Sequence, residues 1–219
     1  MNTPPPLFVC FPDYDAFANA AQSSLTVAEL GVVRSLADRS LPPLTSIRTL
    51  STISGISQRF IVNIAKNPDR YYRTFTIPKG RSHRTIHSPR IALKFFQAWF
   101  GYHLAAAGLH HEIAHGFVPG RSIVSAASVH CNSRWMAKVD LRSFFPSVSM
   151  ARVQDRLIQI GYPELGARLA SSLLCLYNGL PQGSPASPAL SNAVFAPMDE
   201  SIFRWSQERG LRVSRYADD

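Results

Sequence analysis

The chain has 219 residues and a formal net charge of +9; 46% of its residues are hydrophobic and 17% are charged. This composition excludes an intrinsically disordered chain, which is poor in hydrophobic residues, and it allows one full domain or two small ones. Of the 23 basic residues, 19 are arginines, whose planar forks suit phosphate groups. We therefore expect a polyanionic partner; a merely basic soluble enzyme is the alternative.

The cysteines, Cys10, Cys131 and Cys175, are odd in number and widely spaced. This spacing predicts neither a disulfide framework nor a cysteine zinc site. The N-terminus has no basic start followed by an apolar core, so we expect no signal peptide and a cytoplasmic protein. The most apolar long stretch, residues 91–109, is interrupted by polar side chains. It predicts a buried helix rather than a membrane span.

The first 65 residues predict a helical N-terminal extension. Residues 1–24 are proline-rich at the start and lack a periodic pattern, so we expect a loosely ordered lead. In residues 25–36 apolar side chains recur at helical spacing. Residues 49–65 predict two short helices around a Ser-Gly-Ile-Ser turn. This outline resembles a helix-turn-helix, which makes a DNA-binding regulator a rival function.

Residues 66–94 concentrate the positive charge, with a local excess of +7. Within them, residues 72–77 and 84–87 alternate like strands around a Pro-Lys-Gly break, which predicts a basic β-hairpin. Further along the chain we expect helices at 91–108, 150–160, 164–177 and 188–208, and strands at 135–141 and 211–216. Pro197 falls inside the last helix, so we expect a kink or break near Ala193.

Carboxylates end the two expected later strands. Asp140 follows the first, and Asp218 and Asp219 follow the second. Adjacent carboxylates repel each other unless a cation binds, and hard oxygen ligands favour Mg²⁺. Two strands that each present an aspartate would form a two-metal site for in-line phosphoryl transfer. Each aspartate taken singly could instead be a solvated turn residue.

A Tyr-x-Asp-Asp tetrapeptide alone is a weak signal, but here it ends an ordered series of motifs. The series is Phe75-Thr76-Ile77-Pro78-Lys79 with Arg84 and Ile86, His115-Gly116-Phe117 with Gly120-Arg121-Ser122-Ile123, Asp140-Leu141-Arg142-Ser143-Phe144-Phe145-Pro146-Ser147-Val148, Gly179-Leu180-Pro181-Gln182-Gly183-Ser184-Pro185-Ala186-Ser187-Pro188 and Arg215-Tyr216-Ala217-Asp218-Asp219. Over roughly residues 45 to 219 this set resembles bacterial reverse transcriptases, most closely the retron type.

The resemblance implies an α+β fold of the right-hand polymerase type, with fingers, palm and a small antiparallel sheet flanked by helices. It implies fingers with the basic hairpin at 66–137 and a partial palm at 138–219, with fingers-linked helices at about 150–178. The family continues beyond the position of Asp219 with a return strand, further palm strands and a thumb. We therefore expect a fragment, truncated at the catalytic hairpin and with the thumb absent. A separate chain or a missing segment would supply that thumb.

The resemblance also implies roles for individual residues. Asp140 and Asp218, with the carbonyl of Leu141, match the ligands of two Mg²⁺ ions, and Asp219 supports that metal site from beside it. Lys79 and Arg84 match the residues that grip the incoming triphosphate. Phe145 matches the ring that excludes a 2′-hydroxyl, and Gln182 lies in a loop close to the nucleotide and template. From the residues alone, Phe145 could be core and Gln182 a turn residue.

The implied function is an RNA-directed DNA polymerase that transfers dNMP to a primer 3′-OH on an RNA template. Its partners would be the template, a DNA or RNA primer and a dNTP, with no membrane. The alternative is a catalytically inactive nucleic-acid-binding fragment. Where retron enzymes carry Asn-Ala-x-x-His, this chain has Ala126-Ala127-Ser128-Val129-His130. A retron, a group II intron, a diversity-generating element and a defence system all stay open as its context.

One motif points elsewhere. His111-Glu112-Ile113-Ala114-His115 spells the H-E-x-x-H pattern, in which two histidines one helical turn apart bind zinc and the Glu acts as a base. That chemistry needs an unbroken helix, but Gly116 follows at once. A zinc metalloprotease is therefore a remote alternative.

Overall fold

The computed structural model describes residues 5–80 and 82–219; of Lys79 and Ser82 it describes the backbone only. The N-terminal elements are α1 (Tyr14–Ala21), α2 (Val27–Asp38), α3 (Ile47–Ser54), α4 (Gln58–Lys66) and the 3₁₀ turn η1 (Pro68–Tyr71). The strands β1 (Tyr72–Lys79) and β2 (Ser82–Pro89) follow. The later helices are α5 (Ile91–Ala106), α6 (Ile123–Ser128), α7 (Phe144–Ser147), α8 (Met150–Gln159), α9 (Glu164–Leu174) and α10 (Ser187–Gln207). Mixed helix and a small antiparallel sheet confirm the α+β class.

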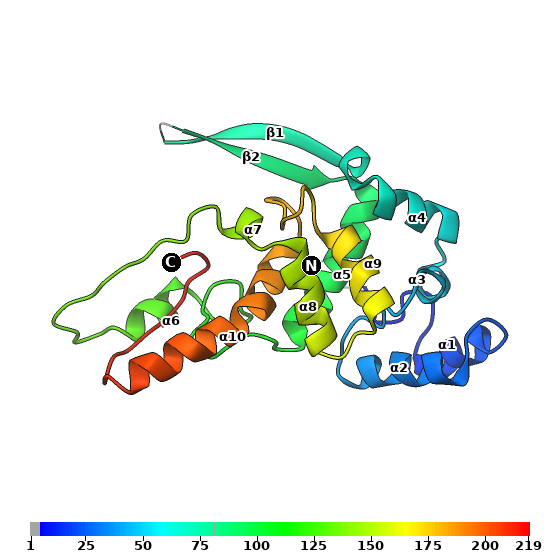
Figure 1. Ribbon diagram of the computed structural model, residues 1–219, viewed down its shortest axis with the longest axis horizontal. Coiled ribbons are helices and arrows are strands. Elements are labelled where there is room, and N and C mark those ends of the chain that lie inside the picture. Colours follow the sequence, from blue (N-terminus) through cyan, green and yellow to red (C-terminus); the bar gives the residue numbers. More distant parts are fainter. Residues whose placement is uncertain (1–4, 81) are drawn as a thin grey trace.

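The centre of the molecule is a layer of helices around α5 (Figure 1). α5 packs against α9 and α10, α8 packs against both of these helices, and α4 packs against α9. Leu93, Trp99, Phe100 and Leu104 on α5 are all at most 1% exposed, because apolar side chains surround this helix on several faces. The prediction of a buried helix is confirmed. Within the described residues, no helix is long and apolar enough to span a membrane.

The N-terminal region is better ordered than the sequence predicts. The expected helices at 25–36 and within 49–65 are confirmed as α2, α3 and α4. A loosely ordered lead is wrong for residues 5–24, which include α1, begun by an Asp13 side chain that accepts the Ala16 N–H at 2.9 Å. Phe8 and Phe17 are buried with ring centroids 5.2 Å apart. Aromatic burial stabilises this segment without a long helical repeat.

The hairpin is longer than predicted and lies along one side of the helical layer (Figure 1). β1 and β2 pair in register from Tyr72 with Pro89 to Lys79 with Ser82. At its base, the His87 N–H donates to the Gln182 carbonyl at 2.7 Å, while Phe75 and Ile77 further out are 42% and 40% exposed. The basic hairpin is confirmed, and it stands on the loop that contains Gln182.

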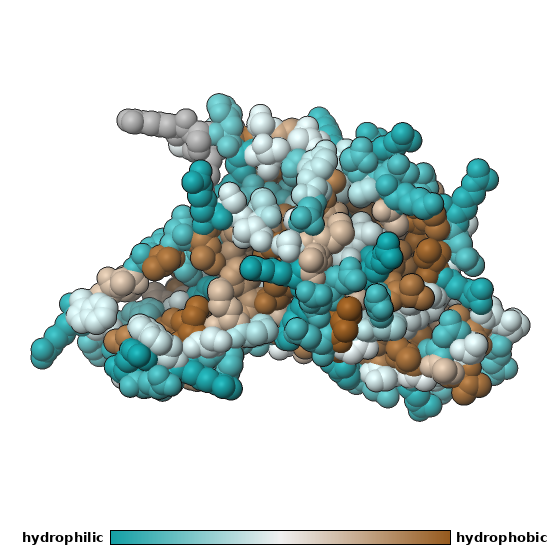
Figure 2. Space-filling model, in the orientation of Figure 1, coloured by the Kyte–Doolittle hydropathy of each residue, from teal (hydrophilic) through white to brown (hydrophobic). Residues whose placement is uncertain are grey.

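The two expected later strands are wrong. Residues 135–141 and 211–216 have extended or irregular backbone, and the pairing found there is an isolated parallel bridge between Ala114 and Arg215. Trp135, Met136 and Val139 are 69%, 69% and 73% exposed, and apolar surface is exposed at the left of Figure 2, where these segments lie. A strand forms only when a neighbour accepts its backbone hydrogen bonds, and no palm sheet is present among the described residues.

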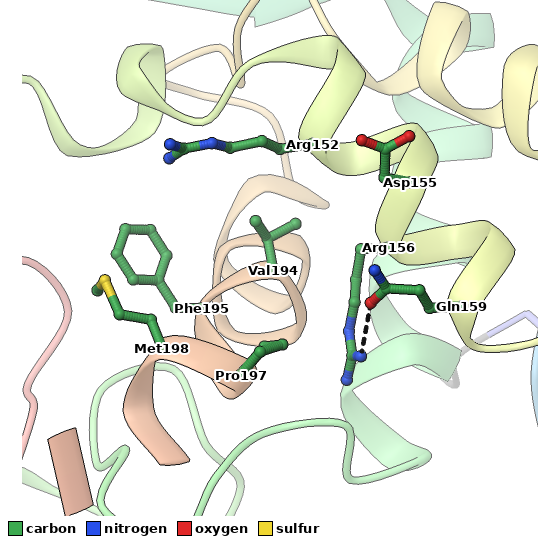
Figure 3. Close-up of a pocket in the computed structure, with 8 residues that line it drawn as sticks. All are labelled: Arg152, Asp155, Arg156, Gln159, Val194, Phe195, Pro197 and Met198. Atoms are coloured by element: carbon green, nitrogen blue, oxygen red, sulfur yellow. Dashed lines mark hydrogen bonds between the residues drawn. The ribbon is translucent and has the colours of Figure 1, made fainter. Parts of the chain in front are cut away.

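α10 runs through Pro197 as one continuous helix, so the expected break near Ala193 is wrong. Proline has no N–H for the carbonyl of Ala193 one turn earlier. Arg156 of α8 supplies the missing donor, because its Nε donates to that carbonyl at 2.8 Å. Arg156 and Pro197 line the same cavity of about 330 Å³ between the two helices (Figure 3).

Candidate active site

Two distant segments meet beside α6 and α10. The loop that leads into α7 lies along the C-terminal segment (Figure 1), and the Leu141 N–H donates to the Asp218 carbonyl at 2.8 Å. Asp140 is thereby held next to Asp218. The Tyr216 N–H donates to the Asp219 carbonyl at 2.7 Å, and the Asp219 N–H donates back to the Tyr216 carbonyl at 3.1 Å. We call residues 216–219 the aspartate turn.

A lysine that the sequence analysis did not single out lies among the three carboxylates. The Lys138 Nζ is 2.9 Å from Asp219 Oδ2. The pKa of Lys138 is raised, first by the hydrogen bond with Asp219 and then by the charges of Asp219, Asp140 and Asp218. All three aspartates therefore favour the charged form of Lys138.

The donors at this site suit a hard divalent cation. Asp140 is exposed and Asp218 half-buried, so both carboxylates can be reached from solvent. Among the described residues no group of three or more acidic, His or Cys side chains forms a ready-made metal cage. Mg²⁺ needs no such cage, because it usually takes one or two carboxylates and completes its shell with water and substrate phosphates.

A groove of about 560 Å³ opens beside the aspartate turn. Its walls come from α6, α10 and the two extended segments, and they include Ile113, Val139, Met198, Ile202 and Val213, with Asp218 and Asp219 also in its lining. Asp218 and Asp219 therefore lie at the edge of an apolar groove and not on a flat surface. This position supports a site that a large ligand can enter.

The loop before α6 forms the floor under the aspartate turn. A Cβ built on Gly116 would collide with the backbone nitrogen of Ala217, so only glycine allows this approach. The His115 N–H donates to the Arg215 carbonyl at 2.8 Å, and the Arg215 N–H donates to the Ile113 carbonyl at 2.7 Å. The His-Gly-Phe motif therefore packs directly against the aspartate turn.

The predicted nucleotide-binding residues lie in two places. Phe145 is half-buried, with its ring 5.8 Å from that of Phe117. Gln182 lies at the base of the hairpin, and the next residue, Gly183, approaches the His87 carbonyl so closely that a Cβ would lie 2.8 Å from it. Arg84 is half-buried on β2. The predicted role of Lys79 concerns a side chain that lies outside the described part of the structure.

The H-E-x-x-H segment does not form a zinc site. Residues 111–115 are turn and bridge rather than helix. His111 Nε2 is 2.8 Å from Glu200 Oε2 on α10, whereas His115 Nδ1 is 2.8 Å from the Ser125 hydroxyl. Burial and the charges of Arg121 and His130 lower the pKa of His115. The two histidines are held by different partners, so the metalloprotease alternative loses its geometric basis.

The sequence of residues 77–219 matches the model of the family described as reverse transcriptase (RNA-dependent DNA polymerase). The chain belongs to this family, and residues 140–141 and 215–219 of the site lie inside the matched region.

Among its relatives are three retron reverse transcriptases. The Retron Ec86 enzyme of Escherichia coli is 30% identical over 182 residues, which cover 82% of this chain and 57% of that protein. The Retron Mx65 enzyme of Myxococcus xanthus is 34% identical, covering 75% and 43%, and the Retron Mx162 enzyme of the same organism is 37% identical, covering 68% and 35%. The chain thus spans about half the length of the curated relatives it matches, and the resemblance to the retron type is confirmed.

Proposed function

We propose that this chain forms the fingers and part of the palm of an RNA-directed DNA polymerase, a nucleotidyltransferase. The observation that carries the proposal is the hydrogen bond from the Leu141 N–H to the Asp218 carbonyl, which brings two aspartates together within the region matched by the family. Residues 66–137 would be the fingers, residues 138–219 the partial palm and residues 1–65 a helical extension. A further segment or separate chain would supply the thumb.

Two Mg²⁺ ions, held by Asp140, Asp218 and the Leu141 carbonyl with support from Asp219, would neutralise phosphate charge and lower the pKa of the primer hydroxyl. The chain's own residues orient the substrates. Arg84 and Lys79 would hold the triphosphate of the dNTP, and Gln182 would lie against the nucleotide at the base of the hairpin. Template-directed incorporation of a dNTP into a primer tests this proposal.

A second candidate is a nucleic-acid-binding chain without turnover. It is favoured by the exposed arginines of the hairpin region, Arg73 and Arg90. It would share template binding with the first candidate but would show no metal uptake that depends on Asp140. Measuring binding and metal uptake separately therefore distinguishes the two.

Replacing Arg73, Arg84 and Arg90 together by Ala should weaken binding of an RNA–DNA hybrid and reduce the slope of log K against log salt by about 2–3. Each phosphate contact that is lost removes about 0.7–0.9 from that slope, because fewer counterions are released. Fluorescence anisotropy over a salt titration measures it.

The matched control replaces three arginines away from the hairpin: Arg34 and Arg39 at α2 and its C-terminal end, and Arg168 on α9. All three are exposed, and each triple variant removes three positive charges, so the two variants differ only in where the charge is lost. Equal slopes for the two triple variants would mean that the hairpin is not the nucleic-acid surface.

Phe145→Val should raise incorporation of ribonucleotides relative to deoxyribonucleotides by about 10- to 100-fold, since removing a steric contact of this kind changes discrimination by about 1–3 kcal/mol. Single-nucleotide incorporation with matched dNTP and rNTP measures the ratio. Phe144→Val is the control: Phe144 is only 5% exposed, so its loss should lower stability and leave the ratio unchanged. If the ratio of ribonucleotide to deoxyribonucleotide incorporation changed with Phe144→Val and not with Phe145→Val, Phe144 would be the gate and the assignment to Phe145 would be wrong.

A further inference from the structure

A buried ion pair lies directly beneath the aspartate turn. Arg215 is 6% exposed and Asp199 of α10 is fully buried. The Arg215 Nε donates to Asp199 Oδ1 at 2.8 Å, and one terminal nitrogen donates to Asp199 Oδ2 at 2.7 Å. Burying two charges is costly unless geometry and further hydrogen bonds compensate, so such a pair needs an explanation.

The remaining donors of Arg215 do not merely complete the pair. One terminal nitrogen donates to the Ala217 carbonyl at 3.1 Å, and the other donates to Asn192 Oδ1 at 3.1 Å. The Asn192 amide in turn donates to the Gly116 carbonyl at 2.9 Å. One guanidinium thus connects α10, the loop under the site and the aspartate turn.

α10 presents these partners on a single face. Asn192, Phe195 and Asp199 are spaced three and four residues apart, which aligns them along one side of a helix. The Arg215 guanidinium carbon lies 5.4 Å from the centroid of the Phe195 ring. The helix therefore fixes the guanidinium from two polar sides and one aromatic side.

The contact with Ala217 explains how the turn is held in its conformation. Ala217 has a φ of +59°, a left-handed conformation that is unfavourable for a residue with a side chain. Its carbonyl is held by Arg215, and the next residue, Asp218, accepts the Leu141 N–H that brings Asp140 close. A shift of the guanidinium would move Ala217 and, through it, the Asp218 carboxylate.

We propose that Asp199 and Arg215 are positioning residues that set the place of Asp218 relative to Asp140. Neither is proposed to touch substrate or metal. This inference rests on the proposed function for its consequence, because the relative position of the two aspartates decides whether they can share a divalent cation.

The test compares Asp199→Asn and Arg215→Lys with Glu200→Gln. Arg215→Lys keeps the charge but loses the fork. Glu200 is the matched control: it is the neighbouring acid on α10 and binds the same loop through His111 at 2.8 Å, but it makes no bond to the aspartate turn. Mn²⁺ affinity is measured by electron paramagnetic resonance, and amide hydrogen exchange is measured at Leu141 and in the α5 core.

We expect a loss of Mn²⁺ affinity of about 10- to 100-fold for Asp199→Asn and Arg215→Lys, as for other groups that orient metal ligands. Exchange at the Leu141 amide should accelerate in both variants while the α5 amides stay protected, and Glu200→Gln should leave both readouts unchanged. Should either variant fail to fold, Asn192→Ala, which loses the bonds to Gly116 and Arg215 but keeps the Asp199–Arg215 pair, should show the same pattern at smaller amplitude.

Unchanged Mn²⁺ affinity and Leu141 exchange in folded variants of lower melting temperature would overturn the proposal and leave an ordinary structural ion pair. If the unaltered chain bound no Mn²⁺ but Leu141 exchange still responded, the positioning of the turn would stand. The proposed metal-dependent function would then be overturned.

Discussion

Replacing Asp140 by Asn is expected to reduce divalent-cation affinity at the aspartate turn by more than about 100-fold and to abolish any primer extension. Even groups that only orient metal ligands cost 10- to 100-fold when changed, and Asp140 is proposed to be a ligand itself. The substitution preserves shape, because Asn and Asp are nearly isosteric. Asp140 is also exposed, so folding should be retained.

Isothermal titration with Mn²⁺ and primer extension on a homopolymer RNA template with Mg²⁺ measure this effect. Asp155→Asn is the control. Asp155 is an exposed carboxylate on α8, so this substitution removes the same charge at a place away from the aspartate turn. Wild-type affinity in Asp140→Asn would contradict the metal site. Extension by the unaltered chain that is lost with Asp140 would exclude the binding-only alternative.

Gly116→Ala should disrupt the site through the backbone. The added Cβ would collide with the nitrogen of Ala217 and lie 3.1 Å from its Cα. Neither side can yield cheaply, because Asn192 holds the Gly116 carbonyl and Arg215 holds the Ala217 carbonyl. Overpacking of this kind costs about 1–3 kcal/mol, and Mn²⁺ binding should be lost together with protection of the Leu141 amide.

Gly31→Ala is the matched control for this substitution. Gly31 lies within α2, and a Cβ there meets nothing within 4 Å. Replacing a glycine inside a helix by alanine should stabilise the protein by about 0.5–1 kcal/mol. Chemical denaturation measures both changes in the free energy of unfolding. A Gly116→Ala variant with normal Mn²⁺ affinity would contradict the prediction, because the turn would then accommodate the added Cβ.

The sequence predicted what depends on local pattern. Helical spacing gave α2, α5, α8 and α9 to within a few residues, and alternation with a Pro-Lys-Gly break gave the hairpin. The aspartates were predicted to meet because their motifs matched a family in order. The helices and the hairpin could be found because the residues that specify them are close together in the chain.

Features that depend on distant partners were missed. The strands at 135–141 and 211–216 did not form, because alternation describes a segment and pairing requires a neighbour. The buried Asp199 looked like any acid on a helix, and its role emerges only when Arg215, sixteen residues later, is seen against it. Arg156 compensates Pro197 from another helix for the same reason. Partners that come from a distant part of the chain leave no periodic pattern in the sequence.

The hairpin is attached to the rest of the molecule near its base, so a rotation there would displace its far end. β2 is bonded to the body at His87 through the Gln182 carbonyl, and Ser82 lies five residue steps along the strand from that point, about 17 Å at 3.3 Å per residue. A rotation of about 10° at the Gln182 loop therefore carries the far end of β2 through about 3 Å, roughly the length of one hydrogen bond. A small rotation at the base of the hairpin would therefore be amplified into a displacement large enough to make or break a hydrogen bond at the far end of β2.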